Sequence, residues 1–355
     1  MNMEPVTDSS AWTSHDLQHD RSWEFQLSPR QQAELQGALQ QVKNGNLQLA
    51  EIARENFPIP SLRQLFAAIQ TGLREGRGFV LLRGFPTEEY ELEDLEKMYW
   101  GLCAHLGTGV TQNSDAGLVH WVTDGRRRPS QGTRGVGDPG LVGPHVDLGD
   151  CVALLCVRQA PDDPHSLVSS STTVYNEILC QHPEWLPRLF EGFVWSRQGE
   201  EGAGETPFSD YRVPAYSVAG GKVTCRFNGS WIRTGMEQAG TPLTDEQSEI
   251  FRFMDEIAVE HGFTFPLHAG DIAICNNYTV FHGRSAHEPV PEEAQKRLLL
   301  RIWIDLKEVR PFADEGLIRY GVIRHGKLGW TAEDLLAGRH HTPHRRRADG
   351  VPAVG

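Results

Sequence analysis

Three common signatures are missing from this sequence of 355 residues. The six cysteines form no CxxC pair, so their spacing indicates neither a zinc knuckle nor a disulfide framework. No apolar run approaches the roughly 20 residues of a membrane-spanning helix. The first twenty residues also lack the basic and then apolar regions of a secretory signal. We therefore expect a soluble, cytoplasmic protein with reduced thiols in its core.

Basic residues are also scarce relative to acidic ones. The chain has 34 Lys and Arg against 47 Asp and Glu, a net charge of -13, which opposes binding to nucleic-acid phosphates or an anionic membrane. Hydrophobic residues make up 39%, enough for a substantial core. The 36 glycines and 21 prolines favour many turns and short strands over a bundle of long helices.

Short strand-like segments separated by turn residues run through the second half of the chain. They lie at 145–159, 166–172, 222–228, 271–277 and 297–305. With a further strand at 79–85, this pattern predicts an all-β core with flanking helices, a double-stranded β-helix of the jelly-roll, cupin-like kind. We expect an N-terminal arm over 1–27, a single jelly-roll domain over 28–310 and a C-terminal extension over 311–355 with a flexible end.

Helical patterns flank these strands. Ser28 followed by a proline predicts a helix through about residue 43, and Ser61 is the expected cap of a second, amphipathic helix. One further helix is expected over 174–191, and Thr244 with Gln247 has the spacing of a capping box for another.

Two long segments and the tail have turn-rich or charged composition. The segment 107–144 reads as a loop with one strand near 119–122, and 198–210 reads as a second mobile loop. We expect loops over 107–144 and 198–216 to build the substrate pocket. The arginine run at 126–128 could steer an anion, although a solvated loop is the commoner reading. HHTPHRRR at 340–347 could bind metal adventitiously, but a flexible tail is favoured.

His145 and Asp147 stand two positions apart at the start of an apolar strand. Residues at this spacing on a strand point to the same face, roughly 6.6 Å apart, so both could reach one metal. An imidazole with a carboxylate suits Fe(II), Mn(II) or Zn(II). The pair alone is weak, because His-x-Asp is common by chance.

A second histidine strengthens the metal hypothesis. In GDIAICNNYTVFHGR, a strand pattern is followed by His282. A histidine brought by another strand would complete a face of two histidines and one carboxylate and would leave the opposite coordination positions open for chemistry.

Two arginines follow in RLLLRIWID, where Arg297, Arg301 and the tryptophan at 303 share one strand face with Leu299. Guanidinium groups on a half-buried strand are costly unless they meet anions. A ligand carboxylate is one such anion, and a buried acid such as Asp271 or Glu292 is the alternative.

HVD at 145–147, NNYTVFHGR at 276–284 and RLLLRIW at 297–303 together resemble the iron(II)- and 2-oxoglutarate-dependent dioxygenases of the taurine dioxygenase/2,4-D dioxygenase (TauD/TfdA) family. The similarity runs from about residue 77 to 306. The chain also resembles the clavaminate synthase-like branch, which typically has glutamate where Asp147 stands.

The resemblance implies roles for individual residues. His145, Asp147 and His282 would bind iron, and Arg297 would bind the distal carboxylate of 2-oxoglutarate. Ser166 would help to hold that carboxylate, with Ser169 as a rival. The interval from His282 to Arg297 is a few residues longer than usual, so the choice between Arg297 and Arg301 stays open.

Candidates for substrate contact follow from the same resemblance. Arg301 corresponds to the residue that grips an anionic substrate in taurine dioxygenase, although a general or structural role is slightly favoured. Trp231, Gln112 and Asn113 are further pocket candidates. The implied partner is a small molecule, with no nucleic acid or membrane, and the oligomeric state is left open.

The implied reaction uses Fe(II), 2-oxoglutarate and O2, with ascorbate as a reductant in assays, and releases succinate and CO2. Related halogenases lack a carboxylate at the position of Asp147, so we expect hydroxylation, desaturation or cyclisation and not chlorination. Two alternatives remain: an oxygenase of the same fold acting on a protein or carrier-tethered group, and a metal-binding jelly roll without catalysis.

Overall fold

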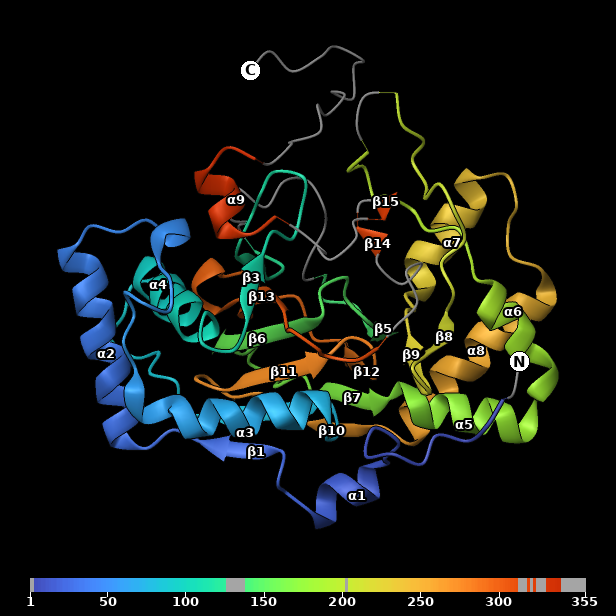
Figure 1. Cartoon of the computed structure of the whole chain (residues 1–355), viewed down its shortest axis with the longest axis horizontal. Helices are drawn as coiled ribbons and strands as arrows, with labels where there is room; N and C mark the ends of the chain where they lie inside the picture. The colour runs from blue at the N-terminus through green and yellow to red at the C-terminus, as the bar shows by residue number, and fades with distance from the viewer. Residues whose placement is uncertain are drawn as a thin grey trace.

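A computed structural model describes residues 3–125, 138–201, 204–311, 318–319, 322–323 and 330–339 (Figure 1). The arginine run at 126–128 and the segment 340–347 lie outside the described residues. Within the described ranges, no helix has both the length and the apolar character needed to cross a membrane.

Two β-sheets form the centre of the molecule. The larger sheet has the order β1 (Glu24–Gln26), β2 (Phe79–Arg83), β11 (Ile272–Asn276), β6 (Cys151–Arg158), β13 (Leu298–Asp305) and β3 (Thr108–Val110), and β4 (His120–Val122) also pairs with β13. The smaller sheet has the order β10 (Phe263–Phe265), β7 (Ser166–Ser170), β12 (Val280–Arg284) and β5 (Val142–His145). Only β1 and β2 pair in parallel within the described part of these sheets. The arrangement confirms the predicted jelly-roll core.

Helices cover the sheets from both sides (Figure 1). The group α2 (Pro29–Asn44), α3 (Arg63–Arg74) and α4 (Leu92–Cys103) lies on one side, and α5 (Ser171–Gln181), α6 (Leu186–Glu191), α7 (Gly229–Gln238) and α8 (Asp245–Glu260) lie on the other. The remaining elements are α1 (Ser14–His19), α9 (Ala332–Leu336), the hairpins β8 (Tyr216–Ala219) with β9 (Lys222–Cys225) and β14 (Ile318–Arg319) with β15 (Val322–Ile323), and short 3-10 turns at Leu49–Glu51, Pro60–Leu62, Pro183–Trp185 and Glu293–Gln295.

Strand β13 separates two hydrophobic layers, as its alternating sequence predicts. Leu300, Ile302 and Ile304 pack with the apolar residues of α2, α3 and α4. Leu299 and Trp303 point the other way, into the layer between the two sheets. Since successive side chains on a strand face opposite sides, the arginine face of β13 is directed toward the space between the sheets.

The helix signals have mixed outcomes. Ser28 and Thr244 cap α2 and α8 as predicted, each in a capping box with the residue three positions on. The cap predicted at Ser61 is wrong, because a 3-10 turn begins at Pro60 and the Ser61 hydroxyl finds no hydrogen-bond partner among the described residues. The helix predicted over 174–191 is divided at His182 and Pro183, where the proline cannot continue the hydrogen-bond ladder.

Asp255 on α8 provides a stability prediction with a defined pH dependence. Burial raises its pKa to about 6, and the nearby Arg233 only partly opposes this. A carboxyl with a raised folded-state pKa destabilises the fold as pH rises from about 4 to about 6, because the unfolded chain ionises more readily. We expect Asp255→Asn to raise the free energy of unfolding by about 1 kcal/mol at pH 7.5, since solvent still reaches part of the carboxyl. Urea denaturation should show no gain at pH 4, and an equal gain at both pH values would contradict this explanation.

Candidate metal centre and adjoining cavity

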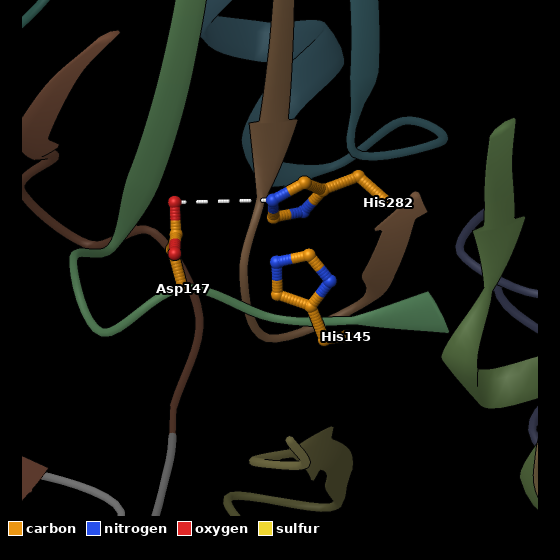
Figure 2. A group of neighbouring side chains, drawn as sticks. All are labelled: His145, Asp147 and His282. Atoms are coloured by element: carbon orange, nitrogen blue, oxygen red, sulfur yellow. Dashed lines mark ion pairs between the residues drawn. The ribbon is translucent and has the colours of Figure 1, made fainter. Parts of the chain in front are cut away.

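His145, Asp147 and His282 converge at one point in the fold (Figure 2). One ligand atom from each lies within 4.8 Å of the others. The ring centroids of the two histidines are 4.4 Å apart, and His282 Nε2 is 3.8 Å from Asp147 Oδ2. The rings come together because His282 of β12 pairs directly with His145 of β5. Two imidazoles and one carboxylate at this separation can bind a single divalent ion.

Asp147 reaches this point by a different route from the one predicted. Strand β5 ends at His145, and Asp147 lies in the turn that leads to β6. His145 and Asp147 therefore do not share a strand face, contrary to the prediction, although the two side chains do come together. The strand signal failed because the alternating apolar pattern continues across this turn into β6.

Hydrogen bonds to the main chain fix the turn that carries Asp147. The Asp147 amide donates to Asn277 Oδ1 over 3.1 Å, and Asn277 Nδ2 donates to the carbonyl of Gly149 over 2.9 Å. Arg226 Nη1 donates to the Asp147 carbonyl over 2.9 Å. The backbone of the turn is thus held by the residue that follows β11 and by the segment after β9, with no metal needed.

The protonation states of Asp147 and His282 suit the binding of a metal ion. Burial raises the pKa of Asp147, but Arg301 and the two histidines outweigh it and hold this pKa well below its usual range. Burial, together with His145, lowers the pKa of His282 to about 3. Asp147 is therefore ionised and His282 is neutral at pH 7, the forms in which both groups bind metals.

The second nitrogen of His145 is also accounted for. Its Nδ1 lies 2.9 Å from the carbonyl of Gly143, so the tautomer with the proton on Nδ1 makes a hydrogen bond there. Nε2 is then left as the acceptor atom that can bind a metal.

A cavity of about 620 Å³ lies against these three residues, between the two sheets. Its lining contains His145, Asp147 and His282 together with Ser166, Trp231, Arg297 and Arg301. Much of the remaining wall is apolar, as with Leu154, Val168 and Phe265. A mostly apolar cavity with a few convergent polar groups is the usual form of a small-molecule site.

Arg297 offers a buried positive charge to this cavity. The residue is 4% exposed, and its Nε donates to Gln159 Oε1 over 2.9 Å. No ion pair to Arg297 occurs within the part of the chain that the structure describes, and Asp271 pairs with Arg83 instead. Burial and the neighbouring Arg284 lower the pKa of Arg297 to about 10, which still leaves it charged at pH 7. A charged guanidinium in this setting is well matched to the carboxylate of a ligand.

The register of β7 decides which serine faces the cavity. Val168 pairs with His282, and Ser166 pairs with Arg284. Directly paired residues point to the same side of a sheet, so Ser166 shares the face of His282 and Ser169 lies on the other. Ser166 accordingly lines the cavity.

The predicted substrate residues occupy three different positions. Trp231 lines the cavity from α7, but the cavity lining contains neither Gln112 nor Asn113 among the described residues. Gln112 lies behind Arg301: its Oε1 accepts from Arg301 Nε over 2.8 Å, and its Nε2 donates to the Arg301 carbonyl over 2.6 Å. Asn113 Oδ1 accepts from the amide of Gly117 over 2.8 Å.

The sequence interpretation missed three polar residues that support this site. Gln159 contacts Arg297, Asn277 holds the Asp147 turn, and Trp303 Nε1 donates to Asp147 Oδ2 over 2.9 Å. Only Trp303 had a usable signal, because it lies two positions after Arg301 on the same face of β13. The other two lie on other elements, and their partners depend on tertiary packing.

Comparison with known proteins agrees with the fold and identifies the family. Residues 43–303 match the family model described as taurine catabolism dioxygenase TauD, TfdA family. FR-33289 synthase of Streptomyces rubellomurinus is 28% identical over 87% of this chain and 92% of its own length.

Two solved oxygenases share the fold. An asparagine oxygenase with Fe(II), 3-hydroxyasparagine and succinate aligns with a TM-score of 0.61 at 16% identity, over 79% of this chain and 93% of that one. The non-heme iron oxygenase OrfP with iron and α-ketoglutaric acid aligns with a TM-score of 0.57 at 13% identity, over 79% and 94%. With the His-Asp-His cluster and the family match over most of its length, this chain belongs to the TauD/TfdA family and is an Fe(II)- and 2-oxoglutarate-dependent dioxygenase.

Proposed function

We propose that this dioxygenase hydroxylates or desaturates a small molecule, with release of succinate and CO2. In this proposal His145, Asp147 and His282 hold the iron, and Arg297 and Ser166 hold the distal carboxylate of 2-oxoglutarate. The observation that carries it is the convergence of three ligand atoms within 4.8 Å on the wall of a cavity that also contains a buried arginine.

In this proposal, different side chains bind the metal, bind the ketoacid and exclude water. Bound iron would activate O2, which is the oxidant, and 2-oxoglutarate would be oxidised alongside the substrate to succinate and CO2. The three metal-binding side chains come from one turn and two paired strands. These elements would fix the position of the metal before 2-oxoglutarate or substrate binds. Arg297 fixes the far end of the ketoacid, and the apolar wall around Leu154 and Phe265 excludes water from it.

Trp231 is the proposed substrate contact, since its side chain reaches the cavity from α7. A volume of about 620 Å³ suits a small molecule. The contacts predicted for Gln112 and Asn113 stay predictions, and the position of Gln112 behind Arg301 favours an indirect role. The oxygenases of the same fold act on asparagine and bind hydroxyarginine, which makes amino acids a sensible first panel of substrates.

The proposal is tested by turnover with Fe(II), ascorbate and 2-oxoglutarate across amino acids and other small polar metabolites. We expect one compound to stimulate succinate formation and to gain one oxygen atom or lose two hydrogens by mass spectrometry. Stimulation only by a protein or a carrier-tethered group would favour the second hypothesis. Family membership sets aside the hypothesis of a jelly roll without catalysis.

The two serines of β7 provide a matched pair of variants. We expect Ser166→Ala to raise the KM for 2-oxoglutarate by about tenfold or more, because one hydrogen bond to a charged group contributes about 1.5 kcal/mol or more. Ser169→Ala should leave this KM unchanged, since its hydroxyl is buried on the opposite face without a hydrogen-bond partner among the described atoms. Steady-state succinate assays measure both values, and the reverse pattern would assign the role to Ser169.

A further inference from the structure

Two side chains of β13 converge on the carboxylate of Asp147. Trp303 Nε1 donates to Oδ2 over 2.9 Å, and Arg301 Nη1 lies 3.2 Å from Oδ2 and 3.3 Å from Oδ1. All three residues are buried. The side chains of Asn277 and Arg226 also form hydrogen bonds with the backbone of Asp147. Together, these contacts fix both the position of Asp147 and the rotation of its carboxylate.

The guanidinium of Arg301 is itself held in place by its neighbours. Its Nε donates to Gln112 Oε1 over 2.8 Å, and its Cζ lies 5.0 Å from the centre of the Trp303 ring. Gln112 also donates to the Arg301 carbonyl, so the side-chain amide of Gln112 holds both the guanidinium and the backbone of Arg301. An arginine held in this way directs Nη1 toward Asp147, although the residue also forms part of the cavity wall.

We propose that Arg301 and Trp303 are positioning residues that orient the Asp147 carboxylate for the metal, and that Arg301 is not the anchor of an anionic substrate. The inference rests on the proposed function, because it assigns these residues a role toward the iron ligand. It departs from the role that Arg301 would inherit by resemblance to taurine dioxygenase.

The packing of the turn supports the same conclusion. A Cβ atom at Gly149 would lie 2.9 Å from the Cβ of Trp303 and 3.2 Å from the carbonyl of Cys151. Only a residue without a side chain allows the turn to approach Trp303 this closely. The turn that carries Asp147 is therefore packed directly on the residue that donates to its carboxylate.

Fixed donors matter here because a carboxylate is otherwise free to rotate about its bond to the rest of the side chain. Without fixed donors, a carboxylate can rotate and bind a metal through either oxygen or both. Outer hydrogen bonds to ligating groups typically contribute a factor of about 10 to 100 in metal affinity. Arg301 also forms an ion pair with Asp147 and so compensates its buried negative charge.

The test is a titration of the metal-free, full-length protein with Co(II) under anaerobic conditions, followed by visible absorption. We expect Trp303→Phe and Arg301→Lys each to weaken Co(II) binding by about 10-fold to 100-fold. Trp100→Phe is the matched control, because Trp100 is also buried and also loses one indole hydrogen bond, to the carbonyl of Ile52, but packs in the helix-covered cluster and not in the cavity lining. Its affinity should stay within about twofold of the wild type.

The outcomes separate this inference from the proposed function. If the wild type fails to bind Co(II), the proposed function fails. If the wild type binds and both variants match Trp100→Phe, only the positioning role is overturned. Arg301→Lys with unchanged Co(II) affinity and a raised KM for the substrate would assign Arg301 to the substrate instead. Thermal melting of the metal-free proteins checks folding, and Arg301→Lys serves as the test if Trp303→Phe does not fold.

Discussion

Replacing His282 with alanine is expected to abolish metal binding in the micromolar range and to lower 2-oxoglutarate turnover by more than about 1,000-fold. His282 supplies one of the three atoms that lie within 4.8 Å of one another, and no other described histidine joins this cluster. Because the reaction needs the metal, loss of the ion removes the chemistry itself and not only part of the binding. Metal content after Fe(II) reconstitution and succinate formation measure the two effects.

His268→Ala is the matched control for this variant. His268 is an exposed histidine on the segment before β11 and is absent from the cavity lining that the described residues form. Its removal should leave iron content and succinate formation unchanged. A His282→Ala protein that retained stoichiometric iron and wild-type turnover would contradict the assignment of the metal centre.

Replacing Arg297 with alanine has the second largest expected effect. We expect the Kd for 2-oxoglutarate to rise by at least about 100-fold, close to 2.7 kcal/mol, since hydrogen bonds to charged groups are each worth about 1.5 to 3 kcal/mol. Arg297→Lys keeps the charge but loses the planar fork, so an intermediate loss of about 10-fold is expected. Anaerobic titration of the Fe(II) protein with 2-oxoglutarate measures these constants.

Co(II) affinity is the control for the Arg297 variants, because Arg297 lies outside the metal cluster. Unchanged Co(II) binding with weakened 2-oxoglutarate binding would locate the defect in the ketoacid site. The opposite result, unchanged 2-oxoglutarate binding in Arg297→Ala and a large loss in Arg301→Lys, would exchange the roles of the two arginines.

Local patterns predicted much of the core. The alternation of RLLLRIWID predicted two faces for β13, and the structure confirms a helix-covered face with Leu300 and an inner face with Leu299. The N-cap and proline at Ser28 and the capping-box spacing at Thr244 predicted helix starts, because each signal lies within one turn of the chain. The cap at Ser61 failed because the preceding proline begins a separate 3-10 turn.

The site was predicted less completely than the core. His145, Asp147 and His282 were identified and do converge, but the strand reasoning for Asp147 was wrong because that residue lies in a turn. Which serine of β7 faces the cavity required the pairing of Ser166 with Arg284, which no local pattern contains.

Contacts between distant segments were beyond prediction. Gln112 and Arg301 are 189 positions apart, and Asp147 and Trp303 are 156 positions apart. Their proximity follows from the packing of β13 beside β4 and β6, which brings the segments after β3 and β5 against the same strand. Hydrogen bonds of this kind depend on the assembled sheet and leave no periodic signal in the sequence.

The most direct test of the proposed metal and ketoacid sites is a crystal structure with Fe(II) and 2-oxoglutarate, from crystals grown under anaerobic conditions. We expect one iron ion bound by the rings of His145 and His282 and by the Asp147 carboxylate, with the distal carboxylate of the ketoacid on Arg297 and Ser166. Iron bound elsewhere, or a ketoacid whose distal carboxylate contacts a different arginine, would contradict these assignments.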